Sequence, residues 1–304
     1  MARALPRLRQ SGFSFVSLTL CTDAEGPEAA LRRIAAQRKI IREDPSLCLV
    51  EHVDDIFAAK ASGRLAVAFN FQGTNAIGGD VALVETFCSL GVKHMLMAYN
   101  RKNAVGDGCH ERTDSGLSHY GIELVQEMNR VGMIVDCSHT GYRTSMDVMA
   151  VSEAPVIFSH SNPKSLYAHD RNITDEQAVA CARTGGLVGV NGVDIFLNDR
   201  NEADAAALFR VADHYCGLIG PDHVGLGLDF VYDPEAMASS MVSFGFKGAG
   251  TDYDKMKSYF EPEELPALVE LMLERGYSEE NVQKILGGNF LRVARQVWKP
   301  RRQH

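Results

Sequence analysis

The sequence has no excess of positive charge and no long hydrophobic run. Its 31 Lys and Arg residues face 39 Asp and Glu residues, which gives a formal net charge of −8. This balance disfavours a nucleic-acid groove or an anionic membrane surface as partner. No run approaches the ~20 apolar residues of a membrane span. With 45% apolar residues and 27 glycines, the composition is that of a globular protein, and a small-molecule partner fits it better.

Paired cysteines and nucleotide-binding loops are also missing. The seven cysteines are odd in number and scattered, without a Cys-x-x-Cys pair, which predicts reduced thiols in a cytoplasmic protein. Basic residues before the apolar stretch 13–20 imitate a signal peptide, but serines and a threonine interrupt that stretch and no small-x-small cleavage site follows, so we expect none. The absence of a Gly-x-Gly-x-x-Gly or Walker loop disfavours a nucleotide-binding enzyme.

Seven apolar runs alternate with helical patterns along the chain. The runs occupy residues 13–20, 65–72, 94–100, 133–139, 155–160, 186–192 and 223–230. Their nearly continuous hydrophobicity is typical of parallel strands covered on both faces. Repeated βα order predicts an α/β fold, either a barrel or a doubly wound sheet. Polar residues at the strand ends favour a (β/α)8 TIM-type barrel in which one strand, expected before residue 13, is missing.

No linker or repeat marks a second domain. We therefore predict one barrel domain over residues 1–304, with carboxyl-terminal helices over 262–298 packing on the barrel. Residues 231–260 have no regular pattern, and we expect a long loop of the kind that covers active sites.

Two histidines stand where apolar runs end. His139 follows one run and His160 the next, with a helical pattern between them, so we expect both at the carboxyl ends of neighbouring parallel strands. Imidazole is a common metal ligand, and Asp229 at the end of the last run adds a carboxylate. This set predicts a zinc site with one open position for water. Gln72 could add a carbonyl oxygen or simply hydrogen-bond the barrel mouth.

Arg171 follows His160 in the loop HDRNITDEQ, just before a helix that Thr174 is predicted to cap. A guanidinium suits bidentate capture of a substrate carboxylate. The alternative is a surface salt bridge with Asp170 or Asp175.

The remaining polar residues at strand ends include Tyr99 and Asn191, which we predict to contact substrate. His94 and His223 come before their strands in this interpretation, which places them at the opposite end of the barrel, and we predict a structural role for both.

Several segments, taken in order, resemble the renal or membrane dipeptidase family of zinc peptidases. They are LGVKHMLMAYN, GLSHYGIELVQEMNRVGMIVDCSH, APVIFSH, HDRNITDE, GGLVGVN, DHVGLGLDF and GGNFLRV, and the resemblance covers residues 5 to 298. It implies a (β/α)8 barrel with two zinc ions that hydrolyses dipeptides through a metal-activated water. By similarity, His139 and His160 match the two histidines of one zinc position. Arg171 matches the arginine that holds the free carboxylate, and Asp229 the aspartate of the other zinc position and of proton transfer.

Three departures from the family pattern change the expected metal content. The family's first strand carries a His-x-Asp pair, and the alignment begins after it. Gln72, in FQGT, replaces the bridging glutamate, and Tyr99 replaces a substrate-site histidine. Two zinc ions bring four positive charges, and of the family's carboxylates only Asp229 is visible here. We therefore predict one zinc ion rather than two, held by His139 and His160 with Gln72 or Asp229.

Three hypotheses remain open. The first is a zinc-dependent, dipeptidase-like hydrolase that cleaves dipeptides with a free carboxyl terminus, with Asp229 as general base and acid. The alternative is a divergent non-peptidase barrel with at most one metal, which binds or transforms a small carboxylate ligand. A third is that the start at Met1 is too late and the first strand is encoded upstream. A barrel short of one strand has an open seam, so we also expect a homodimer.

Overall fold

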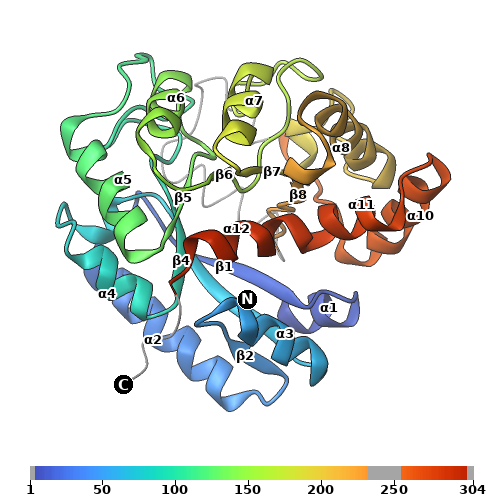
Figure 1. Ribbon diagram of the computed structural model, residues 1–304, viewed down its shortest axis with the longest axis horizontal. Coiled ribbons are helices and arrows are strands. Elements are labelled where there is room, and N and C mark those ends of the chain that lie inside the picture. Colours follow the sequence, from blue (N-terminus) through green and yellow to red (C-terminus); the bar gives the residue numbers. More distant parts are fainter. Residues whose placement is uncertain (1–3, 232–254, 300–304) are drawn as a thin grey trace. The chain divides into compact units, whose positions relative to one another are not determined.

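A computed structural model describes residues 4–231 and 255–299 (Figure 1). The chain forms two compact units. The first unit contains Ala4–Val156 and the segment from Val293 onward, and the second contains Ile157–Arg292. The prediction of a single domain over 1–304 stays a prediction.

The first unit is built on parallel strands with helices between them. Its strands are β1 (Phe15–Thr22), β2 (Leu47–Leu49), β3 (Leu65–Gln72), β4 (Val92–Leu96) and β5 (Ile134–Asp136). Its helices are α1 (Ala4–Gln10), α2 (Pro27–Glu43), α3 (Val53–Ala61), α4 (Leu83–Ser89), α5 (His119–Val131) and α6 (Tyr142–Val151), with the 3-10 helix η1 (Asn75–Ile77). In Figure 1, α4, α5 and α6 follow one another side by side, and α5 contacts both neighbours.

The strands β1, β3, β4 and β5 pair in that order, and all the pairs are parallel. Register places Thr22 opposite Gln72 and Leu96 opposite Asp136. The carboxyl ends of these strands therefore share one edge, as the strand-end argument requires. All eight residues of β3 are buried, which explains why its sequence is almost continuously apolar.

The second unit repeats the same pattern with fewer strands. Its strands β6 (Val156–Phe158), β7 (Leu187–Val190) and β8 (Val224–Leu226) are parallel neighbours in that order. Its helices are α7 (Asp175–Arg183), α8 (Ala205–Ile219), α10 (Leu265–Glu274) and α11 (Glu279–Gln283), with the 3-10 helices η2 (Asp194–Phe196), η3 (Pro221–His223) and η5 (Pro262–Glu264) and the π-helix η6 (Lys284–Gly288). The last helix, α12 (Asn289–Val297), runs across the unit boundary in sequence. Helix α8 packs against α7 and α10.

Helix ends follow the capping rules. Helix α5 begins after Ser118, whose side chain accepts a hydrogen bond from Gly121 N, and it ends at Gly132 with φ 84°. A side chain at Gly132 would place its Cβ 2.7 Å from the Val297 carbonyl oxygen, so glycine is needed there for both conformation and space. Thr174 caps α7 as predicted, accepting from Gln177 N.

All seven predicted strands are present, and the parallel α/β fold class is confirmed within each unit. The sequence interpretation missed β2, which has only three residues. The helices expected over 262–298 are also present. Most of the loop predicted over 231–260 lies outside the described residues. All seven cysteines are free thiols, as predicted, and we find no helix in the described ranges long and apolar enough to cross a membrane.

Candidate active site

Left-handed backbone marks three of the residues that follow strands. Asn100, His139 and Asp229 have φ values of 64°, 61° and 54°, and they come after β4, β5 and β8. Residues other than glycine adopt this conformation rarely, at a cost of roughly 1 kcal/mol or more. Such strain persists where the surrounding structure holds it, and it clusters at functional sites. The turns at Asn100 and His139 therefore mark candidate site residues in the first unit, and the turn at Asp229 marks one in the second.

His139 is locked in place within the first unit. Its Nδ1 lies 2.7 Å from Asn100 Oδ1, so in the neutral ring Nδ1 carries the hydrogen and donates it to this amide oxygen. The Tyr99 ring lies 4.3 Å away between centroids, at 30°, and the His139 carbonyl accepts from Cys109 N at 2.7 Å. This tautomer presents Nε2 as the acceptor nitrogen, which is the arrangement of metal-binding imidazoles.

Asp23, which the sequence analysis missed, ties together the loops of the same edge. Its carboxylate accepts from Thr74 N at 2.7 Å, Asn75 N at 3.0 Å, Tyr99 N at 2.9 Å and Asn103 Nδ2 at 2.9 Å. These donors follow β3 and β4, whereas Asp23 follows β1. Burial raises the pKa of Asp23, and the hydrogen bond from Tyr99 N is the largest of those that act against this shift. Asp23 therefore positions the Tyr99 backbone beside His139.

The glycine that follows Gln72 is the feature of the sequence that could have indicated the close approach of Asp23. Gly73 has φ 151°, and a Cβ there would lie 2.3 Å from Asp23 Oδ1. Gln72 itself is the last residue of β3 and is 9% exposed. Its position at the strand end matches the sequence analysis, and its role as a metal ligand stays a prediction.

The second unit brings His160, Asn191 and Asp229 together. His160 Nε2 lies 3.9 Å from Asp229 Oδ2, and Asn191 Nδ2 donates to the same oxygen at 3.3 Å. His160 Nδ1 lies 2.6 Å from Ser159 Oγ, which leaves Nε2 directed at the carboxylate. Asn162, a residue that sequence reasoning missed, bonds Asn191 N and O through its own side chain. Three of the predicted site residues thus converge.

Arg171 is buried in the same unit, with only 2% of its surface exposed. It donates through NH2 to the His160 carbonyl at 2.8 Å and through NH1 to Ser161 Oγ at 3.2 Å. Its guanidinium also lies 5.7 Å from the Phe196 ring centroid. These contacts therefore hold the Arg171 guanidinium against the His160 backbone.

The alternative salt bridges for Arg171 do not form, because Asp170 pairs with Lys164 at 3.3 Å and Asp175 with His214 at 3.2 Å. Among the described residues no carboxylate lies within ion-pair distance of Arg171, and its Nε has no hydrogen-bond partner there. A buried cation in this state favours an anion as ligand.

The ligand chemistry fits a metal in part. Within the described ranges no three His, Cys, Asp or Glu side chains are grouped closely enough to hold an ion. His160 Nε2 and Asp229 Oδ2 are nevertheless close enough to ligate one ion together, since each bond is ~2.0–2.2 Å long. The second unit therefore contains two of the ligands a metal needs.

The prediction for His94 was wrong about its position. His94 lies inside β4, which begins at Val92, because the apolar run was counted from His94 itself. Its Nδ1 lies 3.0 Å from Asp136 Oδ2 and its Nε2 2.9 Å from Ser17 Oγ. His223, in η3 directly before β8, lies where the sequence placed it.

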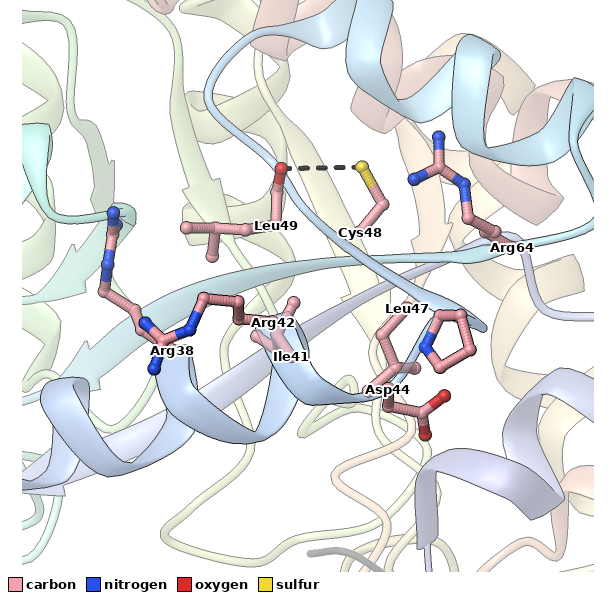
Figure 2. Close-up of a pocket in the computed structure, with 9 residues that line it drawn as sticks. Arg38, Ile41, Arg42, Asp44, Leu47, Cys48, Leu49 and Arg64 are labelled. Carbon is pink, nitrogen blue, oxygen red and sulfur yellow. Dashed lines mark hydrogen bonds between the residues drawn. The ribbon is translucent and has the colours of Figure 1, made fainter.

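A surface cavity of about 490 Å³ lies elsewhere in the first unit (Figure 2). Arg38 and Arg42 of α2, Cys48 of β2 and Arg64 before β3 help to line it. In Figure 2 the Arg38 and Arg42 side chains lie on one side of the β2 segment and Arg64 on the other, so the guanidiniums do not converge. Arg64 is at the opposite end of β3 from Gln72, roughly 25 Å away at ~3.3 Å per residue. The cavity contains none of the predicted site residues.

Comparison with known proteins identifies the family of the chain. The sequence profile of the membrane dipeptidase family (peptidase family M19) matches residues 3–240 and 239–304. An uncharacterized dipeptidase of Schizosaccharomyces pombe is 33% identical over 279 residues, or 88% of this chain and 61% of that protein. A solved amidohydrolase from Pseudomonas aeruginosa is 33% identical with a TM-score of 0.91, covering 98% of this chain and 93% of that one.

A third match is a solved metallopeptidase of family M19, dipeptidase AC. It is 25% identical with a TM-score of 0.79, and the match covers 97% of this chain and 88% of that one.

The chain therefore belongs to the membrane dipeptidase family, a family of metal-dependent hydrolases. Its fold is the α/β barrel type of that family, with seven strands in the barrel order, as the sequence analysis predicted. The chain spans between 52% and 61% of the length of three curated relatives.

Proposed function

We propose that the protein is a zinc-dependent, dipeptidase-like hydrolase that cleaves dipeptides with a free carboxyl terminus. The observation that carries this proposal is Arg171. Its buried guanidinium donates only to neutral oxygens among the described residues, and it contacts the backbone of His160, whose ring faces the Asp229 carboxylate. A substrate carboxylate would neutralise the positive charge of this arginine and would hold the scissile bond near Asp229.

Asp229 is placed to move the proton of the reaction. Asn191 donates to Asp229 Oδ2, which orients the carboxylate, so Asp229 can take a proton from the attacking water and return it to the leaving amine. A zinc ion, when bound, would polarise the peptide carbonyl and make the water more acidic. His160 and Asp229 would hold this ion, with His139 and Gln72 as the further ligands that the sequence predicts.

The number of metal ions that we propose follows from the charge of the side chains near His139. Gln72 brings no negative charge to the first unit's edge, where His139 is oriented by a neutral amide. We therefore propose one zinc ion rather than two. Tyr99, which packs on His139, is proposed to contact the substrate with Asn191.

The experiment is a dipeptide panel run on protein stripped of metal and reloaded with zero, one or two equivalents of zinc. We expect cleavage of free dipeptides at one equivalent and little cleavage of the same dipeptides with an amidated carboxyl terminus. Carboxyl amidation is the matched control, because it removes only the anion that Arg171 would bind. No cleavage of any L,L or L,D dipeptide at any zinc level would reject the proposal.

The alternative function is a non-peptidase that binds or transforms a small carboxylate. The glutamine at position 72 favours it, because the family's two-metal site needs a bridging carboxylate there. This alternative predicts that small carboxylates raise the melting temperature of the protein while dipeptides remain uncut. Binding that Arg171→Met abolishes, in the absence of peptidase activity, would identify it.

We further propose a homodimer located in the cytoplasm. Free thiols at all seven cysteine positions are consistent with a reducing compartment. In the first unit's strand order β1 stands at the end of the sheet, and a sheet edge is a common place for subunit contact. Light scattering of the purified chain tests the dimer, and a monomer at micromolar concentration would contradict it.

A further inference from the structure

A chain of polar side chains runs through the first unit, separate from the residues proposed to bind metal and substrate. Ser17 of β1, His94 of β4 and Asp136 of β5 are joined in line. Ser17 Oγ lies 2.9 Å from His94 Nε2, and His94 Nδ1 lies 3.0 Å from Asp136 Oδ2. These three residue types in this order are those of a serine nucleophile, its general base and the carboxylate that orients the base.

The hydrogen bonds of this chain have a defined direction. Asp136 Oδ1 accepts from Ser138 N at 3.0 Å, which fixes the carboxylate. Its Oδ2 then accepts from His94 Nδ1, so the neutral ring presents the Nε2 lone pair to the Ser17 hydroxyl. At the other end Asn70 Nδ2 donates to Ser17 Oγ at 3.0 Å, while Asn70 Oδ1 accepts from Thr19 at 3.1 Å. With the imidazole neutral, the orientation that satisfies all of these bonds has the Ser17 hydroxyl donating to His94 Nε2.

Burial decreases along this row of side chains from Asp136 to Ser17. The Asp136 side chain is fully buried and the His94 side chain is 6% exposed, whereas Ser17 is half-buried in β1, near the end of the strand order. The carboxylate is therefore shielded from water, and Ser17 is the most exposed of the three residues. A purely structural polar network has no need of this order, while a nucleophile does.

The Asn70 amide adds a donor beside the reacting oxygen. Its Nδ2 is 3.0 Å from Ser17 Oγ, and an oxyanion formed on a substrate by attack of this hydroxyl would be a further acceptor for the amide. Side-chain amides supply this kind of stabilisation in serine hydrolases. Asn70 is 4% exposed and is held by Thr19, so the donor is fixed in place.

We propose that Ser17, His94 and Asp136 form a metal-independent nucleophilic centre for small, reactive esters. Ser17 Oγ bonds to the ester carbon and its proton passes to His94 Nε2. The bond to the leaving alcohol then breaks, and the alcohol takes that proton. Water hydrolyses the resulting acyl ester of Ser17, with His94 again accepting the proton, and the products are the acid and the alcohol. This activity is independent of the proposed dipeptidase site.

The test uses diisopropyl fluorophosphate on the full chain in the presence of a chelator. Ser17 Oγ bonds to phosphorus, and fluoride leaves as the serine proton is removed. We expect mass spectrometry to find the adduct on Ser17, no adduct at that peptide in Ser17→Ala, and labelling slower by about 100-fold in His94→Gln, since a general base contributes at least this much. Hydrolysis of p-nitrophenyl acetate should fall in parallel.

Ser62→Ala is the matched control. Its hydroxyl donates to the carbonyls of Ala58 and Ala59 and has no imidazole partner in the part of the chain that the structure describes, so this variant should be labelled at Ser17 like the unmodified protein. Because His94→Gln alters the core, Ser17→Cys gives a second measurement. A thiol at position 17 should react with iodoacetamide at least tenfold faster than Cys48, which is half-buried without an imidazole partner in the described residues.

Absence of the Ser17 adduct in the unmodified protein would overturn the proposal, as would equal labelling of Ser17 and Ser62. Loss of peptidase activity with zinc would not affect this experiment, because the labelling is performed without metal.

Discussion

The two units hold their strand-end histidines in different ways. In the first unit the His139 ring donates to the neutral Asn100 amide and packs on Tyr99. In the second unit His160 Nε2 faces the Asp229 carboxylate, His160 Nδ1 lies beside Ser159 Oγ, and Arg171 donates to the His160 carbonyl. One histidine thus has only neutral groups as these neighbours, whereas the other has a carboxylate near its ring and a guanidinium at its backbone.

This difference indicates which unit can compensate the charges of a metal ion and a substrate carboxylate. A metal ion and a substrate carboxylate bring opposite charges, and both need compensation in a partly buried site. The second unit contains a carboxylate for the cation and a guanidinium for the anion. In the first unit Gln72 occupies the position where a second carboxylate would make a second metal favourable. The comparison therefore predicts one metal, handled mainly by residues of the second unit.

The largest effect is expected from Arg171→Met. The substitution keeps the volume and removes the cation, so kcat/KM for free dipeptides should fall about 100-fold to 1,000-fold, in line with the loss of a buried charged partner. Activity on amidated dipeptides should change little. Arg183→Met, on the exposed end of α7, is the control. Equal losses on free and amidated substrates would show that Arg171 does not bind the carboxylate.

Asp229→Asn should be nearly as severe. It removes the proton acceptor and one metal ligand, and kcat should fall by about 100-fold or more. Zinc affinity, measured by calorimetry, should fall as well. Asp170→Asn, at a surface pair with Lys164, provides the control and should retain activity. An Asp229→Asn enzyme with full kcat would assign proton transfer to another residue.

Gln72→Glu should remove the difference between the two units. A carboxylate at the end of β3 supplies the missing negative charge, so zinc content by elemental analysis should rise from about one to about two equivalents per chain. Gln72→Met, which adds no charge, should leave the content unchanged. A single equivalent in both variants would mean that charge at this position does not limit the metal count.

Asn100→Ala tests how the first unit holds His139. We expect a loss of about 2–3 kcal/mol in the free energy of unfolding, which combines a buried hydrogen-bond partner with left-handed strain. Asn201→Ala separates the two contributions, because Asn201 also has positive φ, at 57°, but has no hydrogen bond to an imidazole among residues 4–231 and 255–299. Urea unfolding measures both variants. Equal losses would attribute the whole effect to backbone strain.

The smallest effect concerns alkaline pH. Burial raises the pKa of the Cys21 thiol in the first unit and of Cys216 in the second, each to about 11 from 9.0. The folded state therefore holds these protons more tightly than the unfolded state, so the stability they contribute is complete below pH 9 and is lost as pH rises to 11. Cys21→Ala and Cys216→Ala should each flatten this decline in urea unfolding. A decline unchanged in both variants would trace it to other groups.

Local pattern was sufficient for the strands and helix caps. The apolar run 65–72 has the bounds of β3, and Thr174 caps α7 as predicted. These features depend on periodicity and on hydrogen bonds between residues three or four apart, so the sequence contains them directly. For the same reason the strand ends at His139, His160 and Asp229 could be predicted.

Contacts between distant segments could not be predicted in this way. Asp23 collects donors from residues 51 to 80 positions away, and the partners of His94 lie on the separate strands β1 and β5. Arg171 had two equally reasonable environments in sequence, and only packing excluded the surface salt bridge. The sequence by itself determined which residues reach the ends of the strands, because that depends on short-range pattern. The tertiary structure decided which of them meet and with what charge, because hydrogen bonds and burial between distant segments form only when the chain is folded.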